Sequence, residues 1–254
     1  MIMVIQSCTF TIHFPQNPKI REHLFQLEEE LTDFQKPFTL VPIPADAPVD
    51  IPRIVATTPH GHSQVIFCGN SAQVVTKFDG DYVKNVEQSV EYIRQKCNRI
   101  LEVLPLIDES DDEIPKFYFS GLSTTLELNA EDGVESPVSY ISENFLRSKI
   151  DSPIDEVQFR YALVTKEKFY VNVMVQNSRT FIGLPDERGS LAGLRVKDET
   201  LQVVLDINDR YAFNHEVGYR SSKETVSEIT KITEEFMTKK LIHFIQTSEI
   251  CYDE

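Results

Sequence analysis

Residues 221–245 read SSKETVSEIT KITEEFMTKK LIHFI, and this stretch predicts a long helix with one buried face. Ser221 and Glu224 match the S-x-x-E capping box, in which two side chains satisfy backbone N–H groups of the first turn. Apolar residues then recur mostly at three- or four-residue steps: Val226, Ile229, Ile232, Phe236, Leu241 and Ile245. A helix of about 25 residues would be about 37 Å long, which is enough to cross an entire sheet. We expect residues 201–213 to form the strand that leads into it.

A second amphipathic helix is predicted at residues 82–104, ending before Pro105. Its apolar stripe consists of Val86, Val90, Ile93, Cys97, Ile100 and Leu104. Shorter helices are expected after Asn17-Pro18 and Ser136-Pro137, because each pair offers a capping side chain followed by proline at the first helical position. Segments rich in β-branched and aromatic residues predict strands at 3–14, 51–57, 63–68, 72–78, 116–128, 156–165, 169–176 and 179–182.

These elements predict an α+β protein with two similar halves. Each half is expected to run strand, helix, antiparallel strands, long helix, with the long helices covering the sheets. The predicted division is an N-terminal half at 1–107, an acidic linker at 108–113, and a C-terminal half at 114–254 with a Gly-rich insertion at 183–198. A coarse element string of this kind also fits other α+β chains of similar length, so the duplication is a match of pattern rather than of side chains.

The composition argues against several classes of function. The chain of 254 residues has 25 basic and 40 acidic residues, a formal charge of −15. Nucleic-acid and anionic-membrane binders normally have the opposite sign, so neither partner is expected. No segment has the length and apolar character of a signal peptide or a membrane span. The four cysteines are widely spaced, which favours reduced structural thiols and a cytoplasmic protein. No cofactor motif is present, and the sequence does not predict an oligomeric state.

Several features together resemble an uncharacterised, sporadically distributed bacterial family of proteins about 250 residues long. They are the total length, the early hairpin before the 82–104 helix, and the strand Val203-Val204-Leu205-Asp206-Ile207 before the final helix. The resemblance implies an association with mobile or defence genes and supplies no catalytic residues. The order of elements is also similar to that of the TATA-binding protein. That protein is basic and binds DNA on a concave sheet, whereas this chain is acidic.

Two groups of side chains are candidates for metal binding. His60 and His62 flank Gly61, and alternate residues of an extended segment point the same way, as zinc ligands must. The simpler interpretation is a polar turn between strands. Asp206 and Asp209 lie near the end of a predicted strand and are candidate catalytic ligands for a divalent cation. Asp and Asn are also common at strand ends because they form turns.

The segment 183–198 is the strongest candidate for a binding surface. It has neither the Gly-Lys-Ser/Thr of a P-loop nor the spacing of a dinucleotide fingerprint. A loop of this length is uncommon unless it is functional or disordered. Positive and apolar side chains gather there, which favours an acidic partner or ligand: Arg188, Leu191, Leu194, Arg195 and Lys197. A plain variable loop is the alternative.

These observations favour a non-enzymatic, cytoplasmic binding or accessory protein that acts on a protein partner. This prediction depends on the lack of a recognisable catalytic motif and on the segment 183–198. A regulatory role in bacterial defence or in mobile elements is implied only by the family resemblance. One alternative is a metal-dependent phosphodiesterase or nucleotide-processing enzyme that uses Asp206 and Asp209. Another is an acidic inhibitor or nucleic-acid mimic that binds a basic partner.

Overall fold

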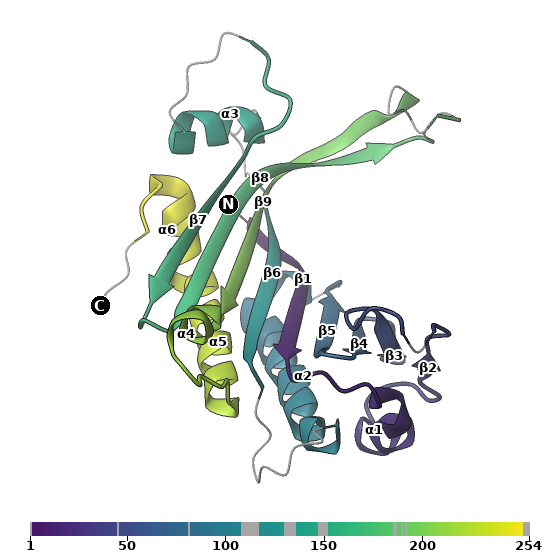
Figure 1. The fold of residues 1–254 in the computed structure, drawn as a ribbon. Helices are drawn as coiled ribbons and strands as arrows, with labels where there is room; N and C mark the ends of the chain where they lie inside the picture. Colours follow the sequence, from purple (N-terminus) through teal and green to yellow (C-terminus); the bar gives the residue numbers. More distant parts are fainter. Residues whose placement is uncertain are drawn as a thin grey trace.

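A computed structural model describes residues 2–250 except 45, 81, 108–116, 130–135, 147–151, 185–186, 189 and 191–192. Within these residues, one antiparallel sheet of nine strands forms the centre of the fold (Figure 1). The strands are β1 (Ile2–His13), β2 (Thr39–Leu40), β3 (Pro52–Thr57), β4 (Ser63–Cys68), β5 (Ser71–Lys77), β6 (Phe119–Asn129), β7 (Gln158–Thr165), β8 (Phe169–Ile182) and β9 (Arg195–Asn208). Their order across the sheet is β2-β3-β4-β5-β1-β6-β9-β8-β7.

The helical segments complete an α+β architecture. They are η1 (Ile20–His23), α1 (Leu24–Glu30), η2 (Tyr82–Lys84), α2 (Val86–Ile107), α3 (Pro137–Ile141), the π-helical η3 (Ser142–Leu146), α4 (Arg210–His215), α5 (Lys223–Glu235), the π-helical η5 (Phe236–Lys240) and α6 (Leu241–Thr247). None of the helices in the described part of the chain has the length and apolar character that a bilayer span requires.

The prediction of two similar halves, each with its own helix-covered sheet, is wrong. β1 pairs with β6 from Ile2 opposite Asn129 to His13 opposite Phe119, so the strands before and after residues 108–116 form one continuous sheet. The physical reason is that strand pairing depends on which edges meet in three dimensions, and an alternating sequence pattern does not record the partner. The α+β class itself is confirmed. The predicted linker at 108–113 lies outside the described residues.

Helices α2 and α5 pack against each other and against the central strands, α2 on β1 and β5 and α5 on β6 and β9. Along β9, buried residues alternate with half-buried ones because successive side chains point to opposite faces of the sheet. The buried set is Leu201, Val203, Leu205 and Ile207, and the half-buried set is Gln202, Val204, Asp206 and Asn208. The sheet therefore has one apolar face under the helices and one polar face opposite.

The final helix differs from its prediction in two details. Ser222, rather than Ser221, is the N-cap of α5, and its side chain accepts a hydrogen bond from the backbone N–H of Thr225. The helical path then passes through the π turn of η5 before α6 begins. Phe236 and Leu241 are both buried although they are five residues apart, and the wider π turn brings this spacing onto one face.

Three predicted boundaries also move. Helix α2 continues past Pro105 to Ile107. The strand predicted at 201–213 ends at Asn208, and residues 210–215 form α4 instead. At its other end β9 begins at Arg195, so part of the expected loop 183–198 is paired strand.

Candidate functional site

The β8–β9 hairpin extends beyond the rest of the sheet. β7 pairs with β8 only as far as Gln176, and β6 pairs with β9 only as far as Leu201. β8 and β9 nevertheless remain paired with each other out to Ile182 opposite Arg195. We call residues 178–182 and 195–200 the arm. In Figure 1 it reaches away from the other strands.

Large apolar side chains are exposed on the arm and just beyond it. Their exposed fractions are 40% for Phe181, 52% for Ile182, 87% for Leu184 and 52% for Val196. Phe181 lies opposite Val196, and paired residues of an antiparallel ribbon project from the same face. The arm therefore presents apolar side chains to solvent that no described part of the protein covers.

The base of the arm is held by a polar cluster. The Asn177 side chain accepts a hydrogen bond from the backbone N–H of Val157 at 2.9 Å and donates one to Glu199 at 2.9 Å. Arg179 donates to the same Glu199 carboxylate at 2.7 Å and also forms an ion pair with Asp155. These contacts join β8, β9 and the residues before β7, so the direction of the arm is set at its base.

The structure places four of the five predicted partner-binding residues at the far end of this hairpin. Arg195 and Lys197 are exposed residues of β9, and Arg188 is exposed in a turn. Leu194 is half-buried, and its side chain lies beside Gly183. Leu191 lies outside the described residues.

The polar face of the sheet has a cavity of about 300 Å³ at the ends of β1, β6 and β9. Gly121 lines it, and a Cβ at this position would come 2.9 Å from Cβ of Asn208, so glycine allows the two strands to approach closely here. The lining is rich in hydroxyl, amide and charged groups: Thr9, Thr11, His13, Gln73, Phe119, Ser120, Gly121, Ser123, Asp206, Asn208 and Arg210. Hydrogen-bonding groups from four strands and α4 thus meet at one place.

Asp206 is the carboxylate of this cavity. One of its oxygens accepts hydrogen bonds of 2.9 Å from both the Asn172 and the Asn208 amides. Burial raises the pKa of Asp206 above its ordinary value despite these donors. His13 lines the same cavity, and burial, assisted by the positive charge of Arg210, lowers its pKa. Both shifts favour the uncharged form of the group.

Asp209 has a different environment from Asp206. It is fully buried, and its carboxylate accepts hydrogen bonds from the backbone N–H of Ser120 at 2.7 Å and from the Tyr219 hydroxyl at 2.8 Å. These bonds connect the end of β9 to β6 and to the segment that precedes α5. The structure gives Asp206 and Asp209 separate partners, and only Asp206 lines the cavity.

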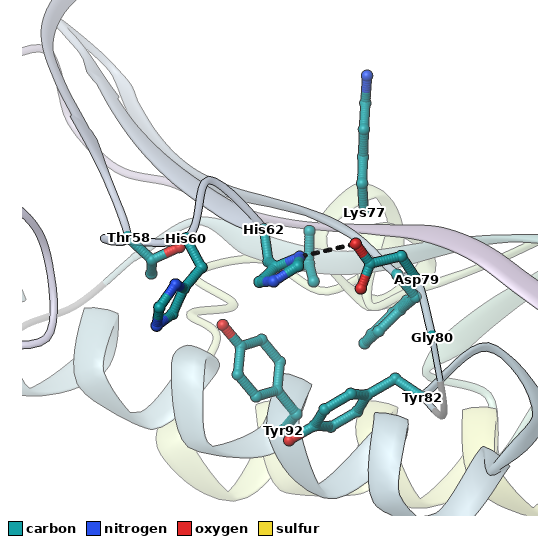
Figure 2. A pocket seen from close by; sticks show the side chains of 10 residues that line it. Thr58, His60, His62, Lys77, Asp79, Gly80, Tyr82 and Tyr92 are labelled. Atoms are coloured by element: carbon teal, nitrogen blue, oxygen red, sulfur yellow. Dashed lines mark ion pairs between the residues drawn. The ribbon is translucent and has the colours of Figure 1, made fainter.

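His60 and His62 lie at a second cavity, of about 380 Å³, between the β3–β4 turn, the end of β5 and the start of α2 (Figure 2). Their ring centroids are 6.2 Å apart, and His62 lies 3.6 Å from the Asp79 carboxylate. Across the described residues, no group of three or more His, Cys, Asp or Glu side chains is arranged to hold a metal ion.

The described cysteines are buried thiols: Cys8, Cys68 and Cys97. Burial raises the pKa of Cys8 to about 12 and that of Cys97 well above its ordinary value. Because the thiolate is the nucleophilic form, Cys8 and Cys97 are poor nucleophiles at neutral pH.

Comparison of the sequence with protein-family models and with curated proteins gives no match.

The sequence predicted one residue of the first cavity, Asp206, and two of the second, His60 and His62, but neither cavity as a whole. Gly121, His13 and Arg210 belong to different elements, so no spacing along the chain relates them. Gly121 was a further local signal, because a glycine inside a strand pattern often marks a close approach of another group.

Proposed function

We propose that this protein is a non-enzymatic binding protein that engages an acidic protein partner through its arm. The observation that carries the proposal is the set of exposed apolar side chains on the arm and just beyond it: Phe181, Ile182, Leu184 and Val196. Apolar surface exposed in a cluster costs free energy in water and is typical of interaction sites. A partner that covers these side chains would recover that free energy.

The backbone of the arm supports a specific mode of binding. Beyond Gln176 and Leu201, the described parts of β8 and β9 pair only with each other. Each strand thus has an outer edge whose N–H and C=O groups are available to an added strand. In strand addition, these main-chain bonds supply affinity, and alternate side chains supply specificity.

The charges of the arm support an acidic partner. Arg195 and Lys197 are exposed on β9 on either side of Val196 in the sequence, next to the exposed carboxylate of Asp198, within a chain whose formal charge is −15. Arg195 pairs with Ile182, so it projects from the opposite face of the ribbon to the Phe181–Val196 pair. A partner with carboxylates next to an apolar segment would match both features. A basic partner would be attracted to the net negative charge of the rest of the protein and would meet Arg195 and Lys197 at this end of the hairpin.

A photo-crosslinking amino acid at Val196 tests the proposal in the native host. We expect it to trap one acidic protein, and the double substitution R195E/K197E should abolish that adduct. The same crosslinker at Val217, which is fully exposed before α5, is the matched control and should not trap this protein.

Apolar contact is tested separately with the double variant Phe181→Ser and Val196→Ser. It should lose the partner, while Phe25→Ser on α1, where the side chain is 73% exposed, should retain it. The proposal is wrong if no adduct forms at Val196, or if the same adduct forms at Val217 or with R195E/K197E.

The alternative of a metal-dependent enzyme remains a prediction. One observation supports it: Asp206 lines the cavity on the polar face of the sheet, which we call the sheet-face cavity. Hydrolysis of phosphodiesters or nucleotides that requires Mg²⁺ or Mn²⁺, and that is lost in Asp206→Ala, would favour the enzyme over the binding protein. The association with defence or mobile genes likewise remains a prediction of the family resemblance.

A further inference from the structure

The cavity beside His60 and His62 is the larger of the two cavities described above, and we call it the tyrosine pocket. It is lined by Thr58, His60, His62, Thr76, Lys77, Phe78, Asp79, Gly80, Tyr82 and Tyr92. Its volume of about 380 Å³ falls in the range of small-molecule sites, which combine aromatic walls with a few polar groups. In Figure 2 its side chains come from the β3–β4 turn, from the end of β5 and the residues that follow it, from η2 and from α2.

Three aromatic rings form one side of the tyrosine pocket. The ring of Tyr92 is steeply inclined to those of Phe78 and Tyr82, with interplanar angles of 74° and 66° and centroid distances of 6.3 and 5.8 Å. Inclined rings make a corner, and the π-electron face of an aromatic ring carries partial negative charge. An aromatic corner of this kind attracts a cation that is not strongly hydrated.

Tyr92 is held in place before any ligand arrives. Its hydroxyl lies 3.0 Å from Oγ of Ser63, which in turn lies 2.7 Å from Oγ1 of Thr76. Lys96, which is paired with Asp33, has its ammonium 5.2 Å from the centroid of the Tyr92 ring. These contacts fix the Tyr92 ring, and a preorganised wall loses little entropy on binding.

The charged group within reach of the tyrosine pocket is negative, like the faces of its aromatic rings. In Figure 2 the Asp79 carboxylate lies near His62 at the rim, whereas the Lys77 ammonium points away from the cavity. The carboxylate is well exposed and within reach of a ligand. An anionic ligand would meet both Asp79 and the net negative charge of the chain, so charge complementarity favours a cation.

We propose that the tyrosine pocket binds a small organic cation with a quaternary ammonium head group. The methyl groups of such a head pack against Phe78, Tyr82 and Tyr92, while its charge is attracted by the ring faces and by Asp79. A metal ion fits less well, because the described residues provide no cluster of three ligands. This site lies in a different part of the fold from the arm and is independent of the partner proposed there.

Calorimetric titration with choline chloride at pH 8 tests the charge requirement. The matched probe is 3,3-dimethyl-1-butanol, which replaces the charged nitrogen with carbon and keeps the shape. We expect choline to bind about fivefold or more tightly than the alcohol. The proposal is overturned if choline shows no binding up to about 50 mM, a limit set by millimolar affinity, or if both compounds bind equally.

Substitutions place the binding at this pocket. Tyr82→Leu should weaken choline binding about tenfold, and Asp79→Asn should weaken it about threefold. The two side chains are exposed, so neither variant should unfold the protein, and circular dichroism checks this. Tyr161→Leu on β7 is the control, because Tyr161 is exposed to a similar degree, 41% against 37% for Tyr82. Equal choline affinity in wild type and Tyr82→Leu would overturn the assignment.

Discussion

The β8–β9 hairpin has two ends that are stabilised in different ways. In its inner part, residues such as Val173 and Leu205 are fully buried beneath the helices, and both outer edges are paired with β7 and β6. In the arm the same two strands expose Phe181 and Val196 and are held mainly by each other and by the cluster at Asn177. The hairpin thus combines a part that maintains the fold with a part whose surface is available for binding.

Removing a core side chain from the inner part should have the largest effect. Leu205→Ala would delete a fully buried side chain of β9 and leave a cavity under the helices. We expect a loss of about 2–5 kcal/mol in the free energy of unfolding. Urea denaturation followed by circular dichroism measures it. A loss below about 1 kcal/mol would show that this part of the hairpin is not packed as described.

The next largest effect is expected at the end of β9, where Asp209 joins three segments. Asp209→Ala would leave the buried N–H of Ser120 and the Tyr219 hydroxyl without this acceptor. Leaving a buried polar group unsatisfied costs about 1–3 kcal/mol. Asp206→Ala is the matched control in urea denaturation, because its carboxylate is only half-buried on the polar face and should cost less. Equal losses would contradict the distinction between the two carboxylates.

The pH dependence of Asp209 provides a second measurement. Burial raises the pKa of this carboxyl in the folded protein above its ordinary value of 3.8. The folded form therefore keeps its proton to higher pH than the unfolded form, and stability falls as pH rises from the unfolded pKa through the folded one. Asp209→Asn does not ionise, so its stability relative to wild type should increase across this pH range. A constant difference from pH 4 upward would show that the carboxyl is not shifted.

Helical patterns could be predicted from the sequence, whereas the length of the β8–β9 hairpin could not. The pattern of 221–245 predicted a buried stripe, and Val226, Ile229 and Phe236 are buried. Helical periodicity is local, so a single segment contains it. The extent of β8 and β9 was missed because Gly183 and the charged residues near Arg195 are typical of a loop, whereas cross-strand pairing keeps those residues in the ribbon. The sheet-face cavity was missed as a whole because its residues come from strands that are distant in sequence. The tyrosine pocket was missed because its residues come from a turn, a strand end and two helical segments that only folding brings together.

A smaller effect is expected from the cluster at the base of the arm. Arg179→Ala would remove the contacts to Glu199 and Asp155, which are partly solvent-exposed. Exposed ion pairs contribute little to global stability. We expect severalfold faster amide hydrogen exchange in residues 178–182 and 195–200, with unchanged exchange in the inner part of the hairpin. Arg160→Ala, on β7, is the control and should leave exchange in the arm unchanged. Faster exchange throughout β8 and β9 in Arg179→Ala would mean that the arm and the inner part open together.

The smallest effect on stability is expected at Val196. This side chain is half exposed and contacts solvent on the same ribbon face as Phe181, so Val196→Ser should change the free energy of unfolding by no more than about 0.5 kcal/mol. Leu205→Ala on the same strand is the reference in the same urea experiment. A loss above about 1 kcal/mol would exceed what one exposed cross-strand pair contributes. It would mean that the arm unfolds together with the core and that its apolar side chains stabilise the fold. A near-zero change would leave the exposed apolar surface without a role in folding, as the proposed contact with a partner requires.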